Sequence, residues 1–271
     1  MAFSLGSRLV SNMPLSEYLK TVVSGFRVIE LPADPRYLSP HFAYTQAQIK
    51  TLRIYQDRYQ FRLTMHAPFT DCRLGALDPD ERSAALQKMY SALQLASELH
   101  IRLFTFHPTT LEPGQPEVYR ENYRYEEESI AKLLEKARSL GVTLLIENMP
   151  KHPHFHPNTS DGSRHQELLW LFPDNHFGLT VDIGHALQAG VSVDSLLKMN
   201  RIKHFHIHDN DRCLDRHYAI TNQLDWWGKL IKKLTRKFTE ASAILEMNQL
   251  DDRMTSFYHL KPFIKPTGLP K

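Results

Sequence analysis

The feature that most constrains the fold of this chain is the regular alternation of short apolar runs with amphipathic helical stretches. The runs are rich in β-branched and aromatic residues, which favours β-strands, and most are followed by a helical pattern. Eight runs are predicted as strands: 2–6, 26–31, 61–66, 102–107, 142–147, 178–182, 202–207 and 243–247. Strands that alternate with helices indicate a parallel sheet, and eight such units in 271 residues match the size of a single (β/α)8 TIM barrel. A doubly wound open sheet is the alternative, but the glycine-rich dinucleotide turn and the P-loop are both missing from the sequence.

Helix boundary signals support this order of elements. The stretch Asp78-Pro79-Asp80-Glu81 combines a capping Asp, a Pro in the first turn and a Glu at the third position, which predicts a helix start. Further helices are expected at 117–140, 225–238 and 251–260, the first of them ended by Gly141. No linker or charge block marks a second domain, so residues 1–271 are expected to form one domain, with a long loop at 151–162.

The composition is that of an ordinary water-soluble protein. Hydrophobic residues make up 42% of the chain, and no apolar run approaches the roughly 20 residues that a membrane span needs. The first residues lack a long apolar segment behind a basic start, so we expect no secretory signal. Cys72 and Cys213 are lone cysteines rather than a disulfide framework, which favours a reducing cytoplasm. The net charge of +3 permits an anionic ligand and does not demand nucleic acid.

Residues that bind divalent metals stand at the ends of six successive expected strands. In barrels of this kind the active site is built at the carboxyl ends of the strands, so these side chains are expected at one mouth. A single His at such a place is more often a hydrogen-bonded core or rim residue. Three imidazoles and three carboxylates together, however, are hard to desolvate unless cations lie between them, and this ligand set suits zinc, manganese or iron. The six are His66, His107, Glu147, Asp182, His206 and Glu246.

The stretch HFHIHDNDRCLDRH (204–217) holds further candidate ligands. His204, His206 and His208 lie on one face of a strand and spread over roughly 13 Å, so they cannot all reach one ion. One is expected to be a ligand and the others to be supporting or core residues. Three more candidates raise the total to nine: His185, Asp215 and His217. Nine ligands suit two or three ions that share bridging carboxylates, and such centres typically catalyse phosphoester displacement.

These residues lie in short motifs whose order resembles the xylose-isomerase-like TIM barrels, and within them the endonuclease IV branch (AP endonuclease family 2). The motifs are MHAP (65–68), TFHP (105–108), LIEN (145–148), VDIGHALQAG (181–190), HIHD (206–209), DRH (215–217) and ILE (244–246). The resemblance implies three metal ions, usually zinc, and a metal-activated hydroxide that attacks a phosphodiester. By position, the first ion would be held by His66, His107 and Glu147, the second by Glu147, Asp182, His206 and Glu246, and the third by His185, Asp215 and His217.

Three features separate the chain from the DNA-repair members of that branch. The loop after the second expected strand, LPADPRYLSPHF (31–42), is short and lacks the Gln- and Arg-rich stretch that enters abasic DNA. Glu30, inside VIEL, resembles the sugar isomerases and epimerases of the superfamily, and we expect Glu30 and His208 to bind substrate. The segment ITNQLDW (220–226) replaces a Gly-x-Gly turn, which reshapes the pocket floor. Trp226 is a further candidate to stack on a substrate, although a Trp pair at a helix start is more often packing.

Three hypotheses about function follow. The first is a metal-dependent phosphoester hydrolase with up to three divalent ions, zinc foremost and manganese or iron next, that acts on a small phosphorylated substrate rather than DNA. The alternative is a single-metal isomerase or epimerase of a sugar or sugar phosphate, in which Glu147 and Glu246 act as acid and base on opposite faces of a carbon acid. The third is a metal-storing or regulatory barrel that has lost its substrate. The basic run KLIKKLTRK (229–237) either meets phosphate groups or is the solvated side of a helix.

Overall fold

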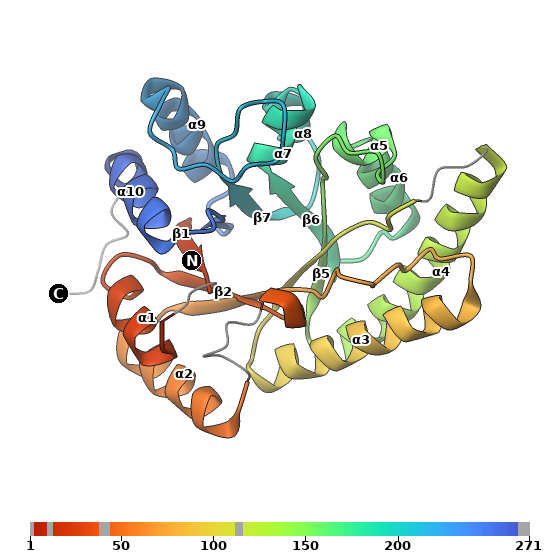
Figure 1. Ribbon diagram of the computed structural model, residues 1–271, viewed down its shortest axis with the longest axis horizontal. Helices are drawn as coiled ribbons and strands as arrows, with labels where there is room; N and C mark the ends of the chain where they lie inside the picture. Colours follow the sequence, from red (N-terminus) through yellow and green to blue (C-terminus); the bar gives the residue numbers. More distant parts are fainter. Residues whose placement is uncertain (1–2, 10–12, 38–43, 112–115, 265–271) are drawn as a thin grey trace.

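Eight parallel strands close into a barrel in the computed structural model of this chain (Figure 1). Each strand pairs with its neighbour in sequence, and the eighth returns to pair with the first. The strands are β1 (Ser4–Arg8), β2 (Val28–Pro32), β3 (Arg62–His66), β4 (Leu103–Phe106), β5 (Thr143–Glu147), β6 (Phe177–Asp182), β7 (Ile202–Ile207) and β8 (Ser242–Leu245). The structure describes residues 3–9, 13–37, 44–111 and 116–264. The prediction of a (β/α)8 barrel is confirmed.

Helices follow the strands and pack around the outside of the barrel (Figure 1). They are α1 (Leu15–Val22), α2 (Gln46–Tyr59), α3 (Pro79–Glu98), α4 (Pro116–Ser139), α5 (Pro157–Ser160), α6 (Ser163–Leu171), α7 (Ile183–Ala189), α8 (Val193–Leu196), α9 (Leu224–Lys237) and α10 (Leu250–Leu260), with 3-10 turns η1 (Pro35–Tyr37) and η2 (Lys261–Phe263). The predicted start of α3 is confirmed, because the Asp78 carboxylate accepts hydrogen bonds from the backbone N–H groups of Asp80 and Glu81. None of the helices in the described ranges has the length and apolarity that a membrane crossing requires.

The barrel interior fixes which side chains share the mouth. Strands β2 and β6 are buried along their whole length, as expected where helices cover one face of a parallel sheet and the barrel core the other. Inside the barrel, the hydroxyl groups of Thr105 and Thr180 are hydrogen-bonded at 2.7 Å. The register of β6 and β7 sets Asp182 beside His206. Because all eight strands are parallel, their carboxyl ends meet at one mouth.

The structure differs from the prediction at several element ends. Strand β2 spans residues 28–32 instead of 26–31, and β4 ends at Phe106, so His107 lies one residue beyond it. Strand β1 spans residues 4–8 instead of 2–6, because Ser7 and Arg8 continue the backbone pairing with β2 beyond the apolar run. Strand β8 ends at Leu245, so Glu246 lies one residue beyond it. The stretch 151–162, expected to be a loop throughout, contains the short helix α5. Residues 38–42 of the loop after β2 lie outside the described ranges.

Candidate metal centre

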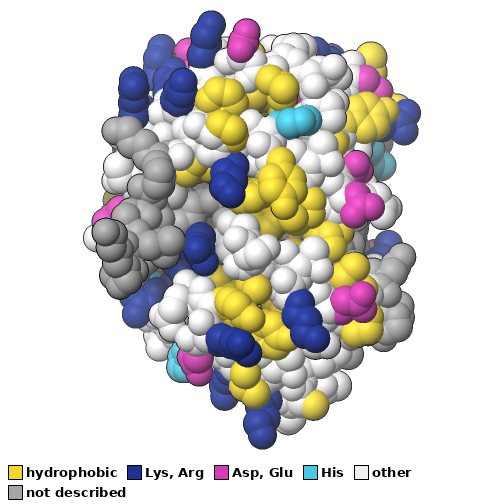
Figure 2. Space-filling view, turned by 90° about the vertical axis from the view of Figure 1, so that its left-hand side faces the viewer, with side chains coloured by type: hydrophobic (Ala, Val, Ile, Leu, Met, Phe, Trp, Pro, Cys, Tyr) yellow, Lys and Arg dark blue, Asp and Glu magenta, His cyan; other side chains and the backbone are white. Residues whose placement is uncertain are grey.

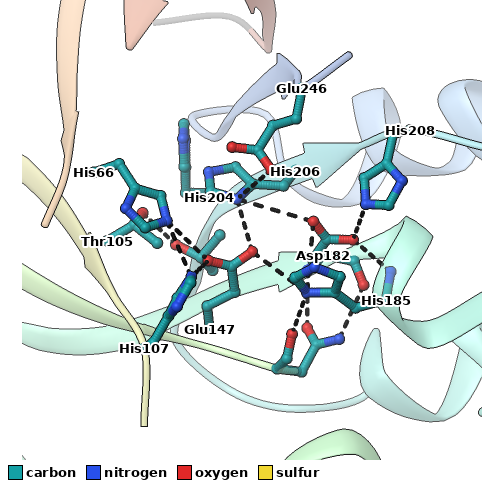
Figure 3. Close-up of polar contacts among 12 residues, drawn as sticks. His66, Thr105, His107, Glu147, Asp182, His185, His204, His206, His208 and Glu246 are labelled. Atoms are coloured by element: carbon teal, nitrogen blue, oxygen red, sulfur yellow. Dashed lines mark hydrogen bonds and ion pairs between the residues drawn. The ribbon is translucent and has the colours of Figure 1, made fainter. Parts of the chain in front are cut away.

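Glu147, the last residue of β5, lies at the centre of a buried group of imidazoles and carboxylates (Figure 3). Its Oε2 is 3.5 Å from Nε2 of His66 and 3.3 Å from Nε2 of His107. The two imidazole Nε2 atoms are themselves 3.1 Å apart. Ligands of one tetrahedral zinc ion are separated by about 3.3 Å, since zinc–nitrogen bonds are about 2.0–2.1 Å long. These three residues therefore have the spacing of ligands around one ion.

His206 joins this group to a second set of carboxylates. Its Nδ1 is 2.8 Å from Oε1 of Glu147, 3.4 Å from Oε2 of Glu246 and 4.0 Å from Oδ2 of Asp182. One oxygen of Glu147 thus faces each set, which is the arrangement of a bridging carboxylate. We call the six strand-end residues the inner cluster: His66, His107, Glu147, Asp182, His206 and Glu246.

A second group lies beside the inner cluster, and its ligand atoms are all within 4.8 Å of one another. Asp215 is at its centre, with Oδ2 3.4 Å from Nε2 of His185 and 3.2 Å from Nε2 of His217. Its other oxygen, Oδ1, is 3.6 Å from Nε2 of His208. We call these four residues the outer cluster. It contains the three residues predicted for a third ion and adds His208.

The histidine tautomers favour metal binding in both clusters. The Nδ1 atoms of His66, His185 and His217 lie 2.9, 2.8 and 2.9 Å from backbone carbonyl oxygens. A carbonyl oxygen only accepts, so each Nδ1 carries the proton and donates it. When neutral, each of these imidazoles therefore has its lone pair on Nε2, which faces a carboxylate, and this is the form in which imidazole binds a metal ion.

Asn148 holds the inner and outer clusters in place. Its side-chain amide donates to the backbone carbonyl of Asp182 at 2.9 Å, and its Oδ1 accepts from the Asp182 N–H at 2.8 Å. Its own carbonyl accepts from His185. Asp182 also caps α7, because its Oδ1 accepts from the backbone N–H of His185 at 2.7 Å. The residue after Glu147 thus fixes the ends of β5 and β6 against each other.

Glu30 lies beneath the inner cluster and is fully buried. Its carboxylate is 3.3 Å from Nε2 of His206 and 3.2 Å from Nε2 of His204. The other nitrogen of His204 is hydrogen-bonded to the Ser242 hydroxyl at 2.7 Å. Glu30, which the sequence analysis proposed as a substrate contact, is therefore placed behind the His206 ring, and His204 takes the supporting position expected of it.

The charges in both clusters are strongly coupled. Burial works to raise the pKa of Glu147, but the charge of His206 and hydrogen bonds from His107, His206 and His66 together outweigh it and hold that pKa well below its usual range. Burial likewise opposes the charged form of His206, but Glu147, Glu246 and Glu30 raise its pKa well above the ordinary value. In the outer cluster, Asp182 and Asp215 overcome burial and raise the pKa of His185 to about 10.

Several buried polar atoms in the two clusters fit metal ligands. Oε2 of Glu147, Oδ2 of Asp182 and Nε2 of His208 have no hydrogen-bond partner. A buried polar atom without a partner costs free energy, and an ion between these atoms would recover it. The residues present thus fit divalent metal ions by their type, spacing and unpaired lone pairs.

Sequence reasoning missed Arg8 altogether. Its Nη1 is 3.3 Å from Oε1 of Glu246, and its side chain is 12% exposed at the mouth. Because the apolar run stops at Gly6, the expected strand ended two residues before Arg8. The signal that could have found it is a cationic residue within two positions of a predicted strand end, at a mouth rich in carboxylates.

Of the other predicted substrate contacts, His208 lies beside Asp182, with its Nε2 3.3 Å from Oδ1, and Trp226 belongs to neither cluster. Trp226 stands at the start of α9, 36% exposed, with its ring 4.9 Å from the buried Trp227. The basic run of α9 is the solvated side of an amphipathic helix, because the apolar residues within it are buried. Its cationic side chains line a shallow hollow: Lys229, Lys232, Lys233, Arg236 and Lys237. Figure 2 shows Lys and Arg side chains gathered along the upper edge of the face on which α9, α10 and α1 lie.

Comparisons with known proteins agree with this geometry. A family model described as xylose isomerase-like TIM barrel matches residues 20–261. The uncharacterized protein MJ1311 of Methanocaldococcus jannaschii is 27% identical over 241 residues, which cover 84% of this chain and 77% of that protein. The structure of a D-tagatose 3-epimerase-like protein is 22% identical, with a TM-score of 0.80 and 96% and 97% of the two chains covered. The structure of the IOLI protein with a binding zinc atom is 17% identical, with a TM-score of 0.71 and 96% of each chain covered.

Proposed function

This chain belongs to the xylose isomerase-like TIM barrels, and we propose that it is a divalent-metal-dependent isomerase or epimerase of a small sugar or sugar phosphate. The observation that carries the proposal is the approach of two carboxylates, from β5 and from beyond β8, to the same nitrogen of His206. The similarity to a D-tagatose 3-epimerase-like protein supports it. These findings favour an isomerase or epimerase over a phosphoester hydrolase.

The ion of this reaction would be held by four side chains of the inner cluster: Glu147, Asp182, His206 and Glu246. When bound, a divalent ion polarises a substrate carbonyl. Glu147, kept as a carboxylate by its lowered pKa, would accept a proton from the carbon next to that carbonyl. Glu246, protonated before this step, would give its proton to the opposite face of the same carbon, so that the substrate is epimerised without a net change in composition. Glu147 would then lose its proton to solvent and Glu246 would take one up.

Arg8 would assist in two ways. Its guanidinium contacts Oε1 of Glu246, which leaves Oε2 of that carboxylate directed toward His206. It also offers a cation at the mouth for the phosphate or the hydroxyl groups of a substrate, since guanidinium matches phosphate geometry. We therefore count Arg8 with Glu147 and Glu246 among the residues of the proposed active site.

The test is proton exchange with solvent. Protein loaded in turn with manganese, cobalt, magnesium or zinc is incubated in D₂O with a panel of ketopentoses, ketohexoses and their phosphates, and the products are analysed by NMR. We expect a new epimer or isomer with deuterium on the carbon next to the carbonyl, and we expect Glu246→Gln to form none. Turnover of no sugar in the panel with any metal would overturn the proposal.

A phosphoester hydrolase is the second candidate, favoured by one observation. His66 and His107 approach the oxygen of Glu147 that faces away from His206, so a second ion could share that carboxylate. Two such ions stabilise both oxygens of a phosphoester displacement. Release of phosphate that carries ¹⁸O from labelled water, lost in His66→Ala, would establish this activity instead.

A further inference from the structure

The exposed side of α9 carries charge of one sign only. Within the run 229–237 the apolar side chains are buried. Every exposed side chain of the run is cationic, and we call these five residues the basic face: Lys229, Lys232, Lys233, Arg236 and Lys237. The whole chain has 33 Lys and Arg against 30 Asp and Glu, and the run contains five of the former and none of the latter. The rest of the chain is therefore net acidic, and the basic face accounts for the whole positive excess.

A solvated helix surface usually mixes both signs of charge, and α4 is an example within this chain. Its sequence combines acidic with basic residues, and Arg124 pairs with Glu128 one turn away at 3.1 Å. On α9 the corresponding neighbours are like charges, as Lys229 and Lys233 are. Like charges at this spacing destabilise a helix. Solvation alone therefore does not account for the basic face, and an anionic partner would offset its repulsion.

The chain itself neutralises little of this charge. In the part of the chain that the structure describes, the carboxylate paired with the basic face is Asp194 of α8, 2.6 Å from Nζ of Lys233. Lys237 donates to the backbone carbonyl of Leu197, a neutral group that leaves its charge unbalanced. Four of the five cations thus have no anionic partner among the described residues and can contact a bound polyanion.

The basic face lies away from the barrel mouth. Helix α9 is on the outside of the barrel (Figure 1) and ends shortly before β8 begins, so its last turns lie near the amino ends of the strands. The contacts with Asp194 and Leu197, which precede β7, agree with this position. A partner held here would not be the substrate of the metal centre, so the inference does not depend on the proposed function.

We propose that the basic face binds the phosphate backbone of a nucleic acid without reading its sequence. The run 229–237 extends over about 12 Å of helix. Its cations border a shallow hollow of about 510 Å³. A nucleic-acid strand carries one charge per ~3.4 Å of its axis, so roughly three to four phosphates span this length. An anionic bilayer fits less well, because lipid binding usually adds apolar side chains that enter the interface, and those of this run are buried.

The salt dependence of binding tests the proposal. The metal-loaded protein is titrated into a fluorescently labelled DNA duplex at increasing concentrations of KCl, and binding is followed by fluorescence anisotropy. Each neutralised phosphate contributes about −0.9 to the slope of log K against log[salt], so we expect a slope of roughly −3 to −4. No binding at low salt, or a slope near zero, would overturn the proposal.

Two double variants remove the same charge from different surfaces. Lys229→Gln combined with Lys232→Gln should weaken binding and reduce the magnitude of the slope by about 1.8, since two phosphate contacts are lost. Lys50→Gln combined with Lys132→Gln, at exposed lysines of α2 and α4, is the matched control and should leave the slope unchanged. Equal changes in the two double variants would show that net charge and not the basic face governs binding, and would overturn the proposal.

Lipid vesicles are the competing probe. We expect vesicles of phosphatidylserine and phosphatidylcholine not to sediment the protein at salt concentrations at which the duplex binds. Sedimentation with these vesicles that is lost in the Lys229→Gln, Lys232→Gln variant, together with no binding of the duplex, would overturn the proposal and assign the basic face to an anionic membrane surface.

Discussion

The inner and the outer clusters lie beside each other at one barrel mouth, but they are built from different kinds of structure. The residues of the inner cluster stand at or directly after strand ends, and the backbone pairing of the barrel fixes their positions. The outer cluster takes its residues from the first turn of α7, the end of β7 and an exposed segment. Strand ends keep side chains in fixed positions. This suits the carboxylates of the proposed active site, because precise placement next to the reacting carbon lowers the activation barrier.

Replacement of Glu147 should have the largest effect on the inner cluster. Glu147→Gln removes the charge that faces His66, His107 and His206, and also the proposed base. We expect epimerase turnover to fall by about 10²–10⁴-fold, the usual contribution of a general base. Asp215→Asn should leave most of the turnover and reduce thermal stability instead. Equal losses in the two variants would erase the functional difference between the clusters and favour a centre in which all the ions take part in the reaction.

Replacement of Glu30 tests whether metal binding by the inner cluster depends on the residues buried beneath it. If His206 binds an ion through Nδ1, its Nε2 carries the proton and donates to Glu30, which orients the ring. Glu30→Gln should therefore weaken the inner ion by ~10–100-fold, as is usual for such partners. The affinity is measured by competition with a chelator, and the outer ion should be unaffected. Thr64→Val is the matched control, because it removes only a 3.3 Å hydrogen bond to Glu30. If Glu30→Gln binds metal as tightly as the unaltered protein, Glu30 does not position His206.

The fold and the inner cluster could be predicted because each depends on a short-range pattern. Strand-like runs alternate with helical ones, and the last residue of a run is at the mouth whatever the details of the loops. The predicted ends of β3 and β5 are those of the structure, which is why His66 and Glu147 were found. Arg8 was missed because pairing with β2 extends β1 beyond its apolar residues, and pairing is a long-range property.

The positions of Glu30 and His208 could not be predicted from the same pattern. Both occur in strand-end motifs, and alternation alone does not say how deep a side chain lies or which neighbours surround it. Glu30 lies below the mouth because β2 continues two residues past it to Pro32, which pairs with His66. His208 enters the outer cluster because Gly184, 24 residues away in sequence, leaves room for its ring. Such packing relations between distant residues appear only in the folded chain.

The pH dependence of the metal-free protein should distinguish the outer cluster from its metal-bound form. Neighbouring carboxylates raise the pKa of His185 from 6.5 to about 10, so the charged imidazole stabilises the fold fully below pH 6.5. That contribution is lost as the pH rises toward 10. We expect the melting temperature of the chelator-treated protein to fall by roughly 5 °C over this range. The zinc-loaded protein should lack this decrease. Metal-free His185→Asn should show a smaller decrease, because the pKa values of His66, His206 and His208 are also raised. A decrease of the same size in His185→Asn would assign it to those three groups.

Trp226 should have the smallest effect, because it lies outside both clusters. If its exposed face contacts the substrate, Trp226→Ala should raise KM by about 3-fold and leave kcat unchanged, since an aromatic contact contributes ~0.5–1.5 kcal/mol. Loss of its packing on Trp227 would lower the melting temperature without changing KM, so the two roles have separate readouts. Trp170→Ala, at a residue of α6 that is 82% exposed, is the matched control and should change neither. A KM unchanged in Trp226→Ala would confine substrate recognition to the inner cluster and Arg8.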